Sequence, residues 1–126
     1  MYEKNPDRTH FFTASLTIQG KGGHSSVPYQ TRNPILPAFT LLQVAAEKVL
    51  YEFTSFQNVA LIPLSFDAGS QQNIIPDTAS LTLRGEAASP EDSEKLKGVL
   101  TGSISALEAL YQVAIRSKFE DYHGQN

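Results

Sequence analysis

The chain has 126 residues, a formal net charge of −3 and no cysteine, and this length is typical of a single domain with a modest core. Its basic residues cluster no more closely than in pairs, so it lacks the positive patch that binds nucleic acid, and no apolar run approaches the ~20 residues that span a membrane. Without cysteine there is no disulfide framework and no thiol nucleophile, and we expect a cytoplasmic protein.

The first two predicted elements are a strand and a long helix. Residues 11–19 alternate between apolar and polar side chains, which predicts a half-buried strand. A helix is predicted over residues 34–53, with Asn33 as its cap and Pro34 as its first residue. The inner face of the strand is predicted to be Phe12, Ala14, Leu16 and Ile18, and the buried stripe of the helix to be Ile35, Phe39, Leu42, Ala46, Val49 and Phe53.

Two further strands are predicted after this helix. Residues 58–66 alternate again, and Pro63 confines this strand to a sheet edge because proline has no N–H to donate. Residues 78–86 form the next strand, with Arg84 and Glu86 on its outer, polar face. The predicted inner residues of the two strands are Ala60, Ile62, Leu64 and Phe66, and Ala79, Leu81 and Leu83.

A second helix and a fourth strand complete the predicted order. The helix spans residues 90–111, since Ser89 has the position of a cap and Pro90 that of the first helical residue. The strand spans residues 113–120 and is followed by a polar tail. The predicted buried residues are Leu96, Val99, Leu100, Ile104, Leu107 and Tyr111 on the helix, and Val113, Ile115 and Phe119 on the strand.

The resulting order, β-α-β-β-α-β, predicts an α+β fold: a two-layer ferredoxin-like sandwich formed by residues 1–126 as one domain. Each strand has one apolar and one polar face, so both helices cover the same side of a four-stranded antiparallel sheet. Right-handed crossovers place the strands at 11–19 and 78–86 in the centre. The exposed edge at residues 58–66, with the adjacent helix at 34–53, is the predicted surface for a homodimer.

Two loops contain residue types that are common in catalytic and ligand-binding sites. Residues 20–28 read GKGGHSSVP and residues 69–77 read GSQQNIIPD. Together with Asn-Pro at 33–34 and LRGE at 83–86, they resemble the lid, or dimerisation, domain of a family of two-metal amidohydrolases and exopeptidases. That family includes aminoacylase, carboxypeptidase G, succinyl-diaminopimelate desuccinylase and hippurate hydrolase. The resemblance covers residues 11–120.

The resemblance implies a role for each loop. His24 corresponds to the histidine that enters the partner subunit's active site and donates a hydrogen bond to the oxygen of the tetrahedral intermediate. Gly22 and Gly23 then serve as hinge and close-approach positions. Asn73 corresponds to a substrate-binding asparagine. Arg84 corresponds to the arginine that grips the substrate carboxylate, although it lies two residues closer to the asparagine than is usual, and a solvated arginine on the polar sheet face is an equal alternative.

The resemblance also implies partners outside the chain. A catalytic domain of the same polypeptide would hold two divalent metal ions, usually zinc, together with the catalytic Glu, and would cleave N-acyl amino acids or small peptides. No cofactor is expected in this chain. His10 and His123 are interpreted as solvated terminal residues, and Glu120, Asp121 and His123 as a polar tail rather than metal ligands.

Two other functions are compatible with the sequence. One is a free-standing ferredoxin-like module whose glycine loop binds a small anionic ligand. The other is a small complete enzyme that uses His24 as a general base, which is disfavoured because no carboxylate or nucleophile is paired with His24 in the sequence.

Overall fold

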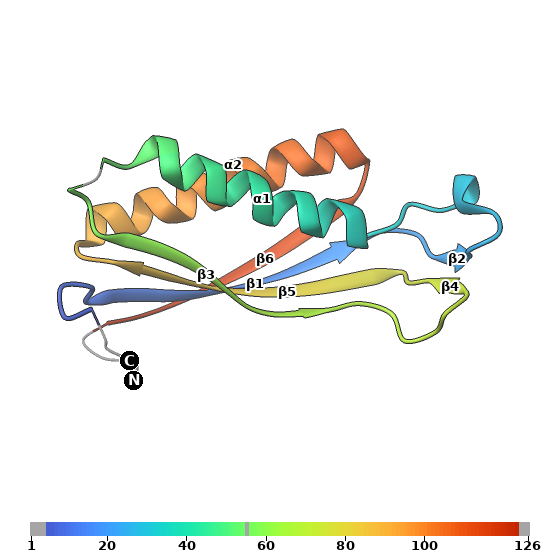
Figure 1. The fold of residues 1–126 in the computed structure, drawn as a ribbon, viewed down its shortest axis with the longest axis horizontal. Helices are drawn as coiled ribbons and strands as arrows, with labels where there is room; N and C mark the ends of the chain where they lie inside the picture. Colours follow the sequence, from blue (N-terminus) through green and yellow to red (C-terminus); the bar gives the residue numbers. More distant parts are fainter. Residues whose placement is uncertain (1–4, 55, 124–126) are drawn as a thin grey trace.

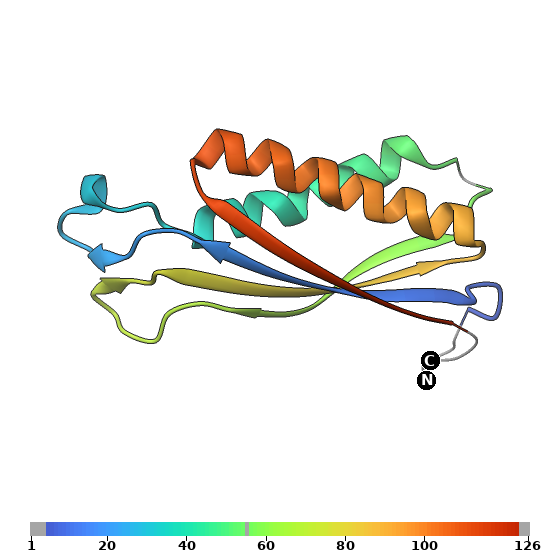
Figure 2. The ribbon, with the colours of Figure 1, turned by 180° about the vertical axis from the view of Figure 1, so that it is seen from behind.

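The computed structural model describes residues 5–54 and 56–123. Its main sheet is antiparallel, with the strand order β3-β5-β1-β6. The elements are β1 (His10–Gln19), α1 (Ile35–Glu52), β3 (Val59–Asp67), β5 (Thr78–Ala87), α2 (Pro90–Tyr111) and β6 (Ala114–His123). Both helices lie on one face of the sheet (Figure 1), and in the described part of the chain the opposite face has no covering layer (Figure 2). The predicted α+β sandwich is confirmed.

The strands β1 and β5 and the helix α2 form the core as predicted. Phe12, Leu16 and Ile18 of β1 are buried against Leu81 and Leu83 of β5. The apolar stripe on α2 is buried from Leu96 to Leu107. At the start of the helix, the side chain of the N-cap Ser89 accepts a hydrogen bond from the Asp92 N–H at 3.1 Å. Each large apolar side chain that is fully buried contributes about 1.5 to 3 kcal/mol. These contacts hold the helix layer on the sheet.

The predicted buried stripe of α1 is wrong at Phe39 and Ala46, which are exposed, whereas Leu42, Val49 and Phe53 of that stripe do contact the core. The buried residues of the helix are Pro37, Ala38, Leu41 and Ala45, whereas Phe39 is 59% exposed. The helix has two apolar stripes, and it turns the one with the smaller residues toward the sheet and α2. The helix also begins one residue later than predicted, with Pro34 as its N-cap, and the Asn33 side chain accepts a hydrogen bond from the Ile35 N–H at 3.0 Å.

The predicted inner face of β3 is also wrong for most of its length. Val59 and Leu61 pack against the core, and Ile62 pairs with Arg84 on the outer face. The register shifts between Pro63 and Ser65, so that Phe66 returns to the helix side and stacks on Phe39 with ring centroids 5.1 Å apart. An extra residue in a strand exchanges its two faces. The edge position of β3, predicted from Pro63, is confirmed.

The polar tail predicted at the end of the chain is the last part of β6. Asp121 pairs with Phe12 and Glu120 with Thr13 on β1. His10, predicted as a solvated residue, is half-buried in β1, and the side chain of His123 lies outside the described part. Within residues 5–54 and 56–123, no helix has the length and apolar character needed to cross a membrane.

Candidate functional site

The two loops singled out in the sequence pair with each other. A two-residue strand β2 (Gly23–His24) pairs antiparallel with β4 (Ile74–Ile75), so that His24 lies opposite Ile74. The Ser25 N–H donates to the carbonyl oxygen of Asn73 at 3.0 Å. The short pairing brings His24 close to Asn73, the residue just before β4, although the two are 49 positions apart in the sequence.

Residues 20–34, here called the glycine arm, form a loop between β1 and α1 whose two ends are hydrogen-bonded to each other. The backbones of Lys21 and Arg32 exchange two hydrogen bonds of 2.8 Å at its base. A 3-10 turn, η1 (Pro28–Gln30), reverses the chain at its far end. Figure 1 shows that the arm and β4 project past the end of α1. The arm therefore presents its residues away from the domain core.

Glycine is required in the arm by close contacts. A Cβ on Gly22 would lie 2.3 Å from the carbonyl oxygen of Ile75, and one on Gly23 would lie 3.0 Å from Cγ2 of Thr31. The Gly22 N–H donates to Oδ1 of Asp77 at 2.8 Å, which ties the arm to the start of β5. Among the described residues, positive φ occurs only at Gly69 and Gln112. The glycines allow the two loops to approach each other and adopt no left-handed conformation.

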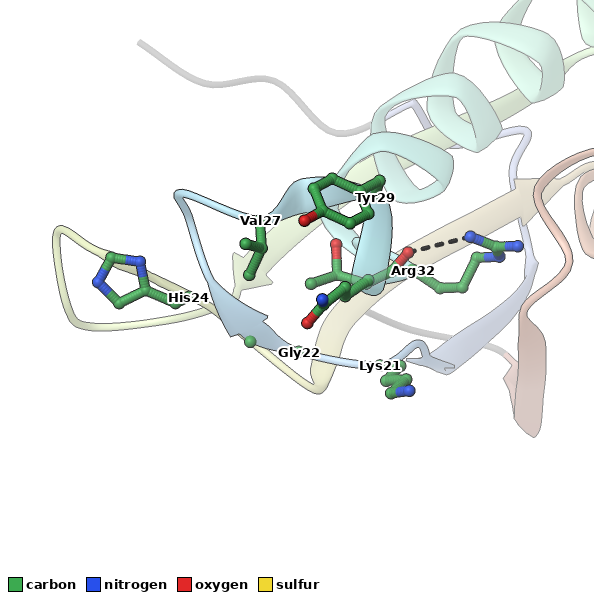
Figure 3. A pocket seen from close by; sticks show the side chains of 9 residues that line it. Lys21, Gly22, His24, Val27, Tyr29 and Arg32 are labelled. Carbon is green, nitrogen blue, oxygen red and sulfur yellow. Dashed lines mark hydrogen bonds between the residues drawn. The ribbon is translucent and has the colours of Figure 1, made fainter.

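His24 is exposed on this arm. Its Nδ1 lies 2.7 Å from Oγ of Ser26 and accepts a hydrogen bond from the Ser26 N–H at 3.1 Å. A pocket of about 580 Å³ is lined by the arm. Figure 3 shows the His24 ring at one side of it, pointing away from Lys21 and Arg32. An exposed imidazole held in this way can offer its second nitrogen to a group outside the domain.

Arg84 is not brought to this site within the chain. It lies on β5 six residues beyond Thr78, which is roughly 20 Å along the strand from the end that carries the arm. Its Nε donates to Oε2 of Glu86 at 2.7 Å, and its guanidinium lies 4.5 Å from the ring centroid of Phe11. It also contacts the hydroxyl of Tyr122. The side chain is therefore neither solvated nor beside His24, and a substrate contact by Arg84 stays a prediction.

Glu86 is the buried centre of this outer-face cluster. It is only 7% exposed, and Arg8 donates to its Oε1 at 3.2 Å while Arg84 occupies Oε2. Burial by itself raises the pKa of Glu86, but hydrogen bonds and charge from Arg84 and Arg8 outweigh burial and hold its pKa below the usual value. The partnership with Arg8 has no signal in the sequence, because Arg8 precedes every predicted element.

Glu86 is expected to make the domain sensitive to acid. Because its pKa is lower in the folded than in the unfolded chain, its contribution is present above the unfolded pKa and is lost as pH falls through the folded value. We expect Glu86→Gln to lower the free energy of unfolding at neutral pH by about 1 to 3 kcal/mol and to flatten its decline in acid. Urea unfolding at a series of pH values measures both effects.

Glu120→Gln is the matched control, because Glu120 is exposed and pairs with exposed Lys118 at 3.5 Å. Such a surface pair contributes little, so its loss leaves the curve nearly unchanged. An acid profile of Glu86→Gln that coincides with those of the parent chain and Glu120→Gln would contradict the assignment.

The described residues do not fit a metal centre. Residues 5–54 and 56–123 contain no group of three or more His, Cys, Asp or Glu side chains placed to hold an ion.

The comparisons with known proteins agree with one another. A family model described as peptidase dimerisation domain matches residues 8–111. Hippurate hydrolase of Campylobacter jejuni is 36% identical over 97 residues, which cover 73% of this chain and 25% of that protein. Thermostable carboxypeptidase 2 of Saccharolobus solfataricus is 28% identical over 109 residues, which cover 82% of this chain and 26% of that protein. The chain thus spans about a quarter of the length of these relatives.

The fold is shared with solved structures of much lower identity. A hydantoinase/carbamoylase family amidase from Burkholderia ambifaria superposes with a TM-score of 0.80 over 93% of this chain and 29% of its own, at 9% identity. At this identity the likeness concerns the fold alone. It shows the same sandwich as one part of a longer polypeptide.

Proposed function

The chain belongs to the peptidase dimerisation domain family, and from this premise we propose that it is the dimerisation and lid domain of a metal-dependent amidohydrolase or peptidase. The proposed substrates are N-acyl amino acids or small peptides, in keeping with relatives named as a hippurate hydrolase and a carboxypeptidase. The catalytic domain, with two divalent metal ions such as zinc, is proposed to be a further part of the same polypeptide. The domain alone is then inactive.

The exposed His24 on the glycine arm is the observation that carries this proposal. An N–H donor that points away from its own core is placed to enter a site formed by another part of the assembly. In amide hydrolysis, negative charge develops on the carbonyl oxygen, and a fixed donor near that oxygen lowers the barrier. We assign this role to His24, acting in the partner subunit's site, and substrate binding to the neighbouring Asn73.

The surface for a second copy of the chain lies on α1 and β3. Leu36, Phe39, Ala46 and Leu50 form an exposed stripe on α1, with spacings of three, seven and four residues that keep them on one helix face. Beside it, Leu64 and Phe66 are exposed on the free edge strand β3. An exposed apolar helix stripe next to an unpaired edge is the kind of surface that a symmetric dimer buries.

The helix carries more of this proposed interface than the strand does. Pro63 lacks an N–H, and the register shift between Pro63 and Ser65 bends the edge. Continuous strand pairing along all of β3 is therefore interrupted, whereas the stripe on α1 is broken only by the exposed Gln43. The interface is isologous, so each residue of the stripe is used twice.

Phe39→Glu is expected to weaken self-association of the chain on the order of 100-fold or more, because the substitution places two charges in the apolar interface of one dimer. Sedimentation velocity over a concentration series measures this loss. Leu110→Glu is the control, since Leu110 is 72% exposed on α2, outside the stripe. A parent chain that stays monomeric at high concentration would refute the dimerisation function, and a Phe39→Glu dimer as tight as the parent would refute the interface on α1.

A further inference from the structure

The ring of His24 has one nitrogen engaged twice by the same residue. The Ser26 N–H lies 3.1 Å from Nδ1, and the Ser26 hydroxyl oxygen lies 2.7 Å from it. A backbone N–H can only donate, so Nδ1 has to accept with its lone pair. A neutral imidazole carries one proton on its two nitrogens, and this geometry therefore assigns the proton to Nε2.

We propose that Ser26 is a positioning residue that holds His24 as the Nε2–H tautomer and directs this N–H outward from the glycine arm. The inference rests on the proposed function, in which His24 acts in the partner subunit's site. Ser26 does not touch the reacting atoms and acts only through His24.

The backbone around His24 is fixed on both sides, so the ring is the only part that needs orienting. The Ser25 N–H is bonded to the Asn73 carbonyl at 3.0 Å, and the Val27 N–H to the His24 carbonyl at 3.1 Å. Ser26 then fixes the ring itself. A donor held in this way needs no reorganisation when charge develops on the carbonyl oxygen, which is the condition for effective oxyanion stabilisation.

The same geometry decides between two roles for His24. A general base needs a free lone pair on the nitrogen that faces the substrate. Here the lone pair is on Nδ1 and is occupied by Ser26, whereas the outward nitrogen carries a proton. In this tautomer His24 is a hydrogen-bond donor through Nε2, and this geometry disfavours the interpretation of the chain as a small enzyme with His24 as its base.

The tautomer can be measured on the 126-residue chain without any enzyme activity. Long-range 1H–15N spectra of the labelled chain, recorded where the ring is neutral, are expected to show the proton of His24 on Nε2. A scalar coupling across the hydrogen bond is expected between the Ser26 amide nitrogen and Nδ1. A proton on Nδ1, or a His24 ring that shows no such coupling and averages both tautomers, would overturn the proposal.

The functional consequence is tested in the full-length enzyme. Ser26→Ala removes the hydroxyl and is expected to lower kcat about 2- to 10-fold, the effect of one neutral hydrogen bond, with KM unchanged and with recovery in Ser26→Thr. Ser25→Ala is the matched control, because the contact of Ser25 uses only its backbone. Equal kcat for Ser26→Ala and Ser25→Ala would contradict the positioning role.

A second pair of variants asks which nitrogen donates. The amide nitrogen of glutamine can reach the position of Nε2, whereas that of asparagine lies near Nδ1, so His24→Gln is expected to retain more turnover than His24→Asn. Equal turnover of the two would contradict an Nε2 donor. If instead His24→Ala keeps full activity while the spectra still show the Nε2–H tautomer, the proposed function fails and the assignment of the tautomer stands.

Discussion

His24→Ala in the full-length enzyme is expected to lower kcat by about 100- to 1000-fold, the usual cost of losing one oxyanion donor, and to change KM little. The hydrogen bond strengthens only as charge develops on the carbonyl oxygen, so its loss destabilises the transition state more than bound substrate. Steady-state kinetics with an N-acyl amino acid measures both constants. The isolated chain keeps its fold and stability, because His24 is exposed and outside the core.

Mixed dimers show whether the contact is made between subunits. Subunits with His24→Ala are mixed with subunits whose catalytic Glu is replaced, and each population alone has at most a small residual activity. If His24 acts in the partner subunit's site, every heterodimer contains one site with both groups, and part of the activity returns. No recovery, with subunit exchange verified independently, would mean that His24 acts in its own subunit or has no part in the reaction.

Gly22→Ala is expected to lower kcat on the order of 100-fold while leaving the sandwich folded. The added Cβ would lie 2.3 Å from the Ile75 carbonyl oxygen, so β2 and β4 have to separate by roughly 1 Å, and a displacement of this size at a reacting group costs about that factor. The move also strains the bond from the Gly22 N–H to Asp77. Kinetics of the full-length enzyme, with amide spectra of the isolated chain, separate the loss of position from unfolding.

The control is the same substitution at Gly98 on α2. A Cβ there meets nothing within 4 Å, and alanine is favoured over glycine inside a helix by about 0.5 to 1 kcal/mol. Gly98→Ala is therefore expected to raise the melting temperature slightly and leave kcat unchanged. If Gly22→Ala and Gly98→Ala have the same kcat, the contact between the arm and β4 does not position His24.

The sequence by itself determined the order of the main elements, the layer arrangement and most of the core. Phe12, Ala14, Leu16 and Ile18 repeat every second residue, and Leu96 to Leu107 repeat with the helical period, so each pattern has one solution. Pro63 placed its strand at an edge because the missing donor is a local property. The GGHSS and NIIPD segments marked the two loops, since a few adjacent residues carry that signal.

Only the tertiary structure decided which face is buried where the pattern has two solutions. On α1 both stripes are apolar, and packing against α2 and the sheet selects Ala38, Leu41 and Ala45, which leaves Phe39 exposed. On β3 the register shift after Pro63 exchanges the faces, and it depends on pairing with β5. The pairing of β2 with β4 is too short to have a period.

The same holds for the polar contacts at His24 and, at the other end of β5, at Glu86. The hydrogen bond from the Ser26 N–H to His24 uses a backbone group that every residue but proline has, so the residue type at position 26 does not predict it. Glu86 and Arg8 are 78 positions apart, and only the folded sheet brings them together. Periodicity and proline or glycine effects depend on neighbouring residues and can be read from the sequence. The buried face of an element, the strand register and long-range pairing depend on the free energy of the whole packed chain. Register and long-range pairing determine where His24 is held.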